Sequence, residues 1–238
     1  MTAVWLMTKS NNWWKQNYST LVFLSPIIGF IALMLIRVWP FDFFLKFIEE
    51  DNFIEYAQFF VLLSGSLWIG YYSLKAKRKS KKSTFIICLL MALSLFFVAG
   101  DEISWGQRIA GLETPETIAQ HNRQNEITIH NLEIVSWMPG WVYLIISWLG
   151  ILSRPIVIII SKINTKILEL YKFAADSRLA GYFVFPAIFH LINFTQGFGI
   201  WPEWAEPMEM FIYSGIVVWM GQIAHQLVKE EKLWTHQK

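Results

Sequence analysis

Six apolar stretches of about twenty residues each dominate the sequence and limit what it can fold into. They cover residues 20–40, 53–74, 84–100, 137–160, 180–200 and 208–228, and polar or charged segments separate them. A helix of about 20 apolar residues is long enough to cross a hydrocarbon core of roughly 30 Å. The sequence therefore predicts an all-α polytopic membrane protein with about six transmembrane helices, in which residues 1–238 form a single integral membrane domain.

Composition agrees with a membrane protein and excludes cysteine chemistry. The chain is 55% hydrophobic and 16% charged, whereas soluble domains carry about 25% charged residues. Most of the 13 tryptophans lie near the ends of the apolar stretches, as interfacial aromatic residues do. Polar residues precede the first stretch and no small-residue cleavage site follows it, so we do not interpret it as a signal peptide. The only cysteine, Cys88, lies inside the third stretch, which rules out a disulfide framework or a cysteine zinc site.

Basic residues in short loops predict the orientation of the chain. The segment "KAKRKSKKS" after the second stretch holds six of them, and the loop 161–179 holds four more. Such loops mark the cytoplasmic side. The sequence therefore predicts a protein of the bacterial inner membrane with both termini in the cytoplasm. The basic loops then meet anionic membrane lipid, and no nucleic-acid partner is needed to explain them.

The predicted outer loop, residues 101–136, is the longest connection on the side where most acidic residues gather. Long connections are often functional or contain structure of their own. Thr114, Pro115 and Glu116 resemble the start of a helix, which would run to about Asn122. A second helix from about Glu126 would place three potential ligands of a divalent metal on one face: Glu126, His130 and Glu133.

Ionisable and polar residues also recur where several stretches end on the predicted outer side. Glu55 and Gln58 lie one turn apart in the second stretch, and Asp101 and Glu102 end the third. His190 and Asn193 share a face in the fifth stretch, and Glu209 opens the sixth. Charged groups at membrane depth are costly and by default indicate a functional site.

Two resemblances bear on this region. "DEISWGQR" followed by "NEITIHN", within residues 99–132, resembles a signature of multi-pass bacterial inner-membrane proteins, Glu-Glu-Ile-Ser-Trp-Gly-Gln-Arg with a downstream His-Asn; Asp101 replaces its first glutamate. This resemblance implies no particular activity.

A second similarity is to CAAX-type intramembrane proteases, and it rests on the order of the polar residues. Here the spacings differ, because Arg108 follows Glu102 by six residues instead of four, and Asn193 follows His190 by three instead of four. The site of that family also faces the cytosol. The similarity implies that Glu102 activates water and that His130, His190 and Asn193 bind or stabilise the substrate.

The residues together favour an outward-facing carboxylate and histidine site of a metal-assisted hydrolase or transferase that acts on a lipid or lipid-linked group. The predicted catalytic residues are Glu102, Asp101, Arg108 and His130. The predicted ligands of a divalent metal are Glu55, Glu102, His130 and His190, and the predicted substrate-binding residues are Gln58, Asn131 and Asn193. Three alternatives remain: a transporter or membrane-complex subunit that relays ions or protons, a scaffold whose polar residues only fasten helices together, and a CAAX-type protease.

Overall fold

The computed structural model describes residues 2–38, 41–48, 53–122, 125–135, 138–196 and 201–229, with side chains from Tyr18 onward. Its long helices are α1 (Thr2–Val38), α3 (Phe53–Arg78), α4 (Lys82–Glu102), α7 (Met138–Ser161), α8 (Ala180–Thr195) and α9 (Ala205–Lys229). Shorter helices connect them: α2 (Phe41–Ile48), η1 (Ser104–Gly106), α5 (Gln107–Ala110), α6 (Glu116–Ala119), η2 (Thr165–Phe173), η3 (Ser177–Leu179) and η4 (Pro202–Trp204). The described residues form no strand beyond one isolated bridge between Asn122 and Leu132. The predicted all-α fold is confirmed.

Five segments of the described chain are long and apolar enough to cross a membrane: Tyr18–Val38, Phe53–Arg78, Lys82–Glu102, Met138–Ser161 and Pro202–Lys229. The protein is therefore a multi-pass membrane protein. The fifth predicted stretch, 180–200, forms α8, which has 16 residues and ends at Thr195. Residues 197–200 of this predicted stretch lie outside the described residues.

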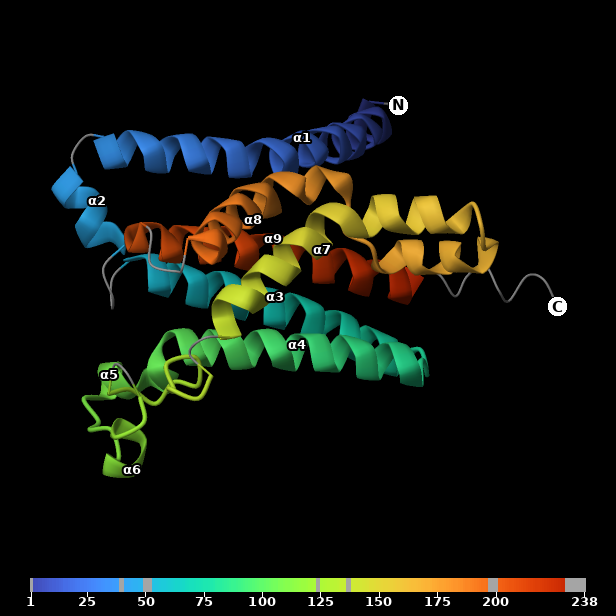
Figure 1. Ribbon diagram of the computed structural model, residues 1–238. Coiled ribbons are helices and arrows are strands. Elements are labelled where there is room, and N and C mark those ends of the chain that lie inside the picture. Colours follow the sequence, from blue (N-terminus) through green and yellow to red (C-terminus); the bar gives the residue numbers. More distant parts are fainter. Residues whose placement is uncertain are drawn as a thin grey trace.

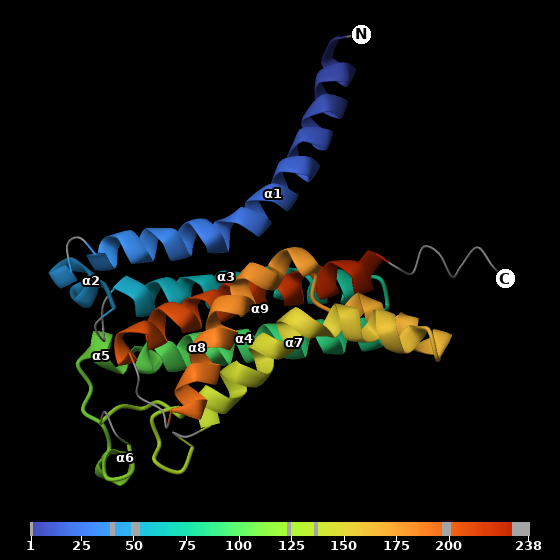
Figure 2. The ribbon, with the colours of Figure 1, turned by 45° about the horizontal axis from the view of Figure 1, so that its top comes forward.

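The helices form a bundle built around α9 (Figure 1). Helices α3 and α4 form an antiparallel hairpin, and α9 packs along α3. On the other side of α9, α7 and α8 form a second hairpin, and α1 packs against α8 and α2. The N-terminal part of α1 projects away from this bundle (Figure 2).

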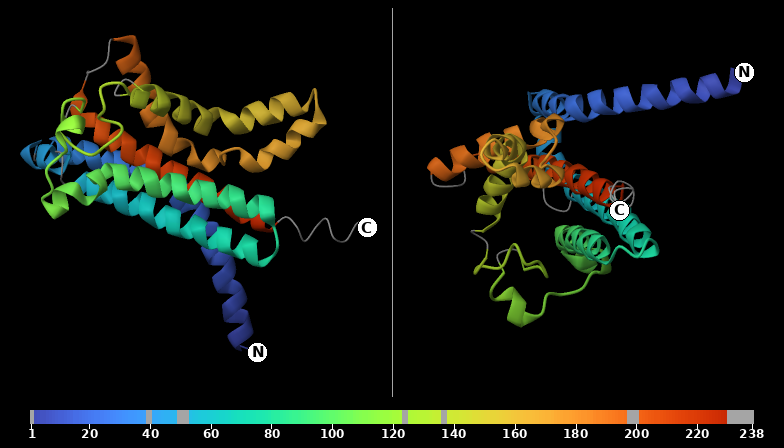
Figure 3. Two further views of the ribbon diagram at one scale, coloured as in Figure 1. Left: turned by 90° about the horizontal axis from the view of Figure 1, so that it is seen from below. Right: turned by 90° about the vertical axis from the view of Figure 1, so that its right-hand side faces the viewer.

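The two ends of the bundle differ in character. The turn between α3 and α4, the connection from α7 to α8 and the end of α9 lie at one end (Figure 3). Helices α2, α5 and α6 lie at the other. Both basic loops thus share one end, and the segment 101–135 lies at the opposite end.

Glycines let the central helices approach closely. The Phe183 ring of α8 is fully buried, with Gly150 of α7 on one side and Gly215 of α9 on another. A Cβ at Gly150 would overlap this ring, and one at Gly215 would lie 2.7 Å from it. Small residues at helix contacts are the usual means of tight packing in membranes, so α7, α8 and α9 are locked together at Phe183.

We expect Gly150→Ala to destabilise the bundle by about 1–3 kcal/mol, the usual cost of overpacking a tight core. Gly70→Ala is the matched control, because a Cβ there would meet only Ala92 at 4.0 Å and alanine favours helix by about 1 kcal/mol over glycine. Thermal unfolding of the detergent-purified variants measures the difference. Equal melting temperatures for the two variants would contradict the packing described here.

Candidate functional site

The chain reverses sharply after α4, where the sequence reads "DEISWGQR". Ser104, Trp105 and Gly106 have φ angles of 48°, 54° and 77°, a left-handed conformation that is costly for residues other than glycine. The Trp105 ring folds back onto Gly100, where a Cβ would lie 2.7 Å from it, and onto Phe97. Such strained backbone persists only where the surroundings enforce it, and it is common at functional sites.

Four side chains of this turn hold the outer loop. Asp101 accepts hydrogen bonds from the backbone N–H groups of Ile129 (2.8 Å) and His130 (3.3 Å), and its Oδ2 lies 2.7 Å from Nδ1 of His130. Ser104 donates to Glu126 over 2.5 Å, and Arg108 forms an ion pair with the same carboxylate.

Gln107 is the fourth of these side chains. Its Oε1 accepts from the backbone N–H of Ile127 at 2.7 Å, and its Nε2 donates to the carbonyl of Leu112 at 3.1 Å. The second bond is local, whereas the first crosses the loop and holds Ile127 against the start of α5.

These contacts explain why the predicted second loop helix is wrong. Residues 125–135 form turns, and Glu126, His130 and Glu133 do not share a helical face. The backbone N–H groups that a helix would pair with its own carbonyls are instead bound by Asp101 and Gln107.

The first predicted loop helix exists but is shorter than expected. It is α6, Glu116–Ala119, and its N-cap is Pro115. Thr114 does not cap it, because its hydroxyl donates to the carbonyl of Asn125.

Glu102 points in a different direction from its neighbour Asp101. Its Oε1 accepts a hydrogen bond from the hydroxyl of Tyr213 on α9 at 2.8 Å. The hydroxyls of Tyr213 and Tyr143 are 2.7 Å apart, and the Tyr143 hydroxyl lies 3.1 Å from Oε2 of Glu209. Each tyrosine hydroxyl has one hydrogen, so these contacts form a continuous hydrogen-bonded chain between α4, α9 and α7 when Glu209 is protonated and donates to Tyr143.

Three carboxylates converge at this point. One oxygen from each of Glu102, Glu206 and Glu209 lies within 4.8 Å of the other two. Gln58 of α3 donates from Nε2 to Oε2 of Glu206 and to its backbone carbonyl, both at 3.0 Å. Carboxylates this close repel one another in a medium of low dielectric constant, so their charge must be offset by protons, hydrogen-bond donors or a cation.

An apolar cavity of about 470 Å³ opens beside these groups, between α3, α4, α7, α9 and the outer loop. Aliphatic side chains and Phe97 form most of its wall. Its polar lining consists of Ser94 and a group at the loop end of the helices: Asp101, Glu102, His130, Tyr143 and Tyr213. The cavity therefore combines a wall suited to hydrocarbon with one chemically active end.

His130 lies in the loop and contributes an imidazole to that end. Burial alone would lower the pKa of His130, but the hydrogen bond that its ring donates to Asp101 and the negative charges of Glu102 and Asp101 outweigh it and raise the pKa above its usual 6.5. Because Nδ1 faces Asp101, the carboxylate fixes the orientation of the ring, as the acid partner of a catalytic histidine does.

The structure brings some of the predicted site residues together and not others. Asp101 pairs with His130, and Glu102 joins the carboxylates of α9. Glu55 lies close enough to Glu102 to interact with it electrostatically. Arg108 pairs with Glu126 in the loop, and neither Arg108 nor Asn131 lines the cavity.

The two predicted site residues of α8, His190 and Asn193, do not line the cavity. His190 is buried, its ring is 5.4 Å from that of Tyr143, and its Nε2 has no hydrogen-bond partner in the part of the chain that the structure describes. Asn193 donates to the carbonyl of Phe189 in its own helix at 3.1 Å. Among the described residues, the converging carboxylates include only Glu102 of the four predicted metal ligands.

Sequence reasoning missed Tyr143, Tyr213 and Glu206 as site residues. A signal for two of them was present, because Glu206, Glu209 and Tyr213 follow the spacing i, i+3, i+7 that places residues on one helix face. Tyr143 carried no such signal, since an aromatic residue near the end of a span is equally typical of the interfacial belt.

Fold and site together define a multi-pass α-helical membrane protein with a carboxylate and tyrosine cluster beside an apolar cavity. No family model, no curated protein and no solved structure matches the chain. Its function must therefore be argued from the site itself, since fold alone does not imply function.

Proposed function

We propose that the protein is a membrane-embedded hydrolase or transferase that acts on a lipid or a lipid-linked group. One observation carries the proposal: the 470 Å³ cavity is apolar along its wall and has its carboxyl, imidazole and phenol groups at one end. A ligand with a hydrocarbon part and a polar head matches this division, because ligand sites are mostly apolar with few polar groups that fix orientation.

The polar end contains the groups that acid–base chemistry needs. Glu102 accepts a proton from a water molecule, or from the hydroxyl group of a second substrate. The oxygen of that water or hydroxyl then attacks an ester carbon or a phosphorus atom of the head group. His130, oriented by Asp101, donates a proton to the oxygen that leaves. General acid–base catalysis of this kind contributes about 10²–10⁴ in rate.

The charge distribution supports a location and an orientation. We place the protein in the bacterial inner membrane with both termini in the cytoplasm, because the two basic loops share one end of the bundle and basic loops favour the cytoplasmic side. The cavity and its polar end then lie towards the outer face.

A proton-relaying transporter or membrane-complex subunit is the second candidate. The observation that favours it is the chain of hydrogen bonds from Glu209 through Tyr143 and Tyr213 to Glu102, since connected titratable groups in a membrane can pass protons. Such a relay needs no lipid in the cavity, and this difference separates the two candidates.

Blocking the cavity tests whether it holds a lipid, as the proposed enzyme requires. Val142 of α7 lines the cavity, and Val142→Trp should fill the space that the hydrocarbon chain occupies. We expect native mass spectrometry of the gently solubilised wild type to show a retained lipid, and Val142→Trp to show at least tenfold less.

Ile145→Trp is the control, because Ile145 lies on the same helix, is exposed and does not line the cavity. It should retain lipid as the wild type does. Equal lipid occupancy in the two tryptophan variants would contradict a lipid-binding cavity and would favour the relay.

A further inference from the structure

Gln58 contains a buried oxygen that its surroundings leave without a partner. The residue is 0% exposed, and its Oε1 has no hydrogen-bond partner among the described residues. Its Nε2 faces two acceptors, the carboxylate and the backbone carbonyl of Glu206. A flipped amide would place oxygen against both acceptors, so hydrogen bonding fixes the orientation and leaves Oε1 without a donor.

An unsatisfied buried acceptor is destabilising and calls for an explanation. The same amide contacts Glu206, one of the three converging carboxylates, and ionised carboxylates are acceptors that give Oε1 no hydrogen. A cation satisfies all four groups at once, because it binds an amide oxygen and offsets the repulsion among the carboxylates.

We propose that Glu102, Glu206, Glu209 and Oε1 of Gln58 form a binding site for one hard divalent cation of the magnesium, manganese and calcium class. The all-oxygen donor set fits this class, since soft sulfur ligands are absent from it and carboxylate and carbonyl oxygens suit these ions. Oxygens on opposite sides of a cation at about 2.3 Å would lie about 4.6 Å apart, and the three carboxylate oxygens lie within 4.8 Å of one another.

This site differs from the metal site that the sequence predicts, which uses Glu55, His130 and His190 with Glu102. Imidazole favours zinc and other transition metals, whereas the converging ligand atoms here are oxygens. Tyr213 lies within hydrogen-bonding distance of Glu102 and Glu209 and would fix the orientation of these two ligands. Residues that hydrogen-bond to metal ligands do the same in known metal sites.

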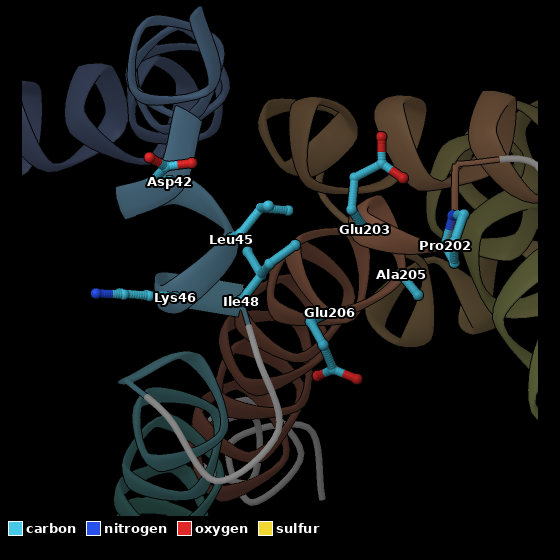
Figure 4. A pocket seen from close by; sticks show the side chains of 8 residues that line it. All are labelled: Asp42, Leu45, Lys46, Ile48, Pro202, Glu203, Ala205 and Glu206. Atoms are coloured by element: carbon cyan, nitrogen blue, oxygen red, sulfur yellow. The ribbon is translucent and has the colours of Figure 1, made fainter. Parts of the chain in front are cut away.

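A route for the cation leads from the outer end of the bundle. Glu206 also lines an open pocket of about 770 Å³ between α2 and the start of α9, together with Asp42 and Glu203 (Figure 4). Its carboxylate points away from those two acids. Lys46 also lines this pocket and Glu203 pairs with Arg37. Asp42 and Glu206 are therefore the acids that would attract a hydrated cation, and Glu206 links the pocket with the cluster.

The cation would deepen the proposed function, because Glu102 belongs to both sites. A divalent ion next to the cavity would polarise the head group or bind the attacking water. Cation binding nevertheless depends only on the four oxygens and not on any lipid chemistry, so the two proposals can fail separately.

The test is a titration of the full-length protein with Mn²⁺, followed by electron paramagnetic resonance of the free ion. The protein is held in nanodiscs of zwitterionic phosphatidylcholine, so that anionic head groups do not compete. We expect one Mn²⁺ per chain, displaced by Mg²⁺ or Ca²⁺, and binding at least about tenfold weaker in Glu206→Gln. Even the loss of a residue that only hydrogen-bonds to a metal ligand typically weakens metal binding about 10–100-fold.

Glu203→Gln is the matched control, because Glu203 lines the same outer pocket but does not belong to the cluster; it should bind Mn²⁺ as the wild type does. Gln58→Leu is a second variant that removes Oε1 without adding charge and should also weaken binding. Absence of Mn²⁺ binding by the wild type would overturn the site, and so would equal weakening in Glu203→Gln and Glu206→Gln.

The outcomes also separate this inference from the proposed enzyme. If lipid is retained in the cavity but no Mn²⁺ binds, the cation site fails and the enzyme stands. If Mn²⁺ binds and the cavity retains no lipid, the enzyme fails and the cation site stands.

Discussion

Glu102→Gln is expected to abolish the function of the protein while it still inserts and purifies normally. The change keeps the shape of the side chain and its contact with Tyr213, but it removes the carboxylate that acts as base. Loss of general-base catalysis alone lowers a rate by about 10²–10⁴. The measurement is complementation of the loss-of-gene phenotype in the native host at matched expression.

Glu113→Gln is the control for this experiment, because Glu113 is an exposed residue of the outer loop. It should complement fully. If Glu102→Gln also complements fully, the carboxylate only anchors the end of α4 and the catalytic proposal is wrong.

Asp101→Asn is expected to loosen the outer loop, since the Asp101 carboxylate binds Ile129 and both the backbone and the ring of His130. Hydrogen bonds to charged groups contribute about 1.5–3 kcal/mol, so we expect faster cleavage within residues 125–135 in limited proteolysis of the purified protein. Wild type and variant should share the same helix content.

The pH dependence of this cleavage tests the same pair. The pKa of His130 is raised in the folded protein, so the protonated ring stabilises the fold; this stabilisation is full below pH 6.5 and is lost as the pH rises through the folded pKa. Cleavage of the wild-type loop should therefore accelerate with rising pH, and the change should shrink in Asp101→Asn. A pH profile that is identical in the two proteins would contradict the account of the pair.

Much of the fold follows from simple rules because membrane spans are determined by length and polarity. The stretches around 53–74, 84–100 and 137–160 became α3, α4 and α7 with small shifts in their ends. The stretch 180–200 is longer than α8, which ends at Thr195; residues 197–200 lie outside the described residues. Helix α2 was not predicted, because a helix of eight residues is too short to be recognised as a membrane span.

The outer loop shows why local pattern failed. The i, i+4, i+7 spacing of Glu126, His130 and Glu133 is compatible with a helix, but the backbone of this segment binds Asp101 and Gln107, which lie 28 and 20 residues from their partners in the chain. Local propensity is a weak guide where long-range hydrogen bonds compete for the backbone.

The same contacts divide the charges that follow α4 into two groups. Asp101 and Arg108 hold the loop, whereas Glu102 faces the bundle and meets the carboxylates of α9. The sequence could place these residues at a membrane boundary, but only the packing of α9 and α7 against α4 reveals which of them belongs to the cluster.

The most direct test of the central claim is a lipid conversion assay with purified protein. Wild type and Glu102→Gln are reconstituted in vesicles made from the total lipid extract of the native host, and the lipids are compared by mass spectrometry over time. The account predicts that the wild type depletes at least one lipid species and forms a matching product, while Glu102→Gln leaves the extract unchanged. Lipid profiles that stay identical for the two proteins would contradict it.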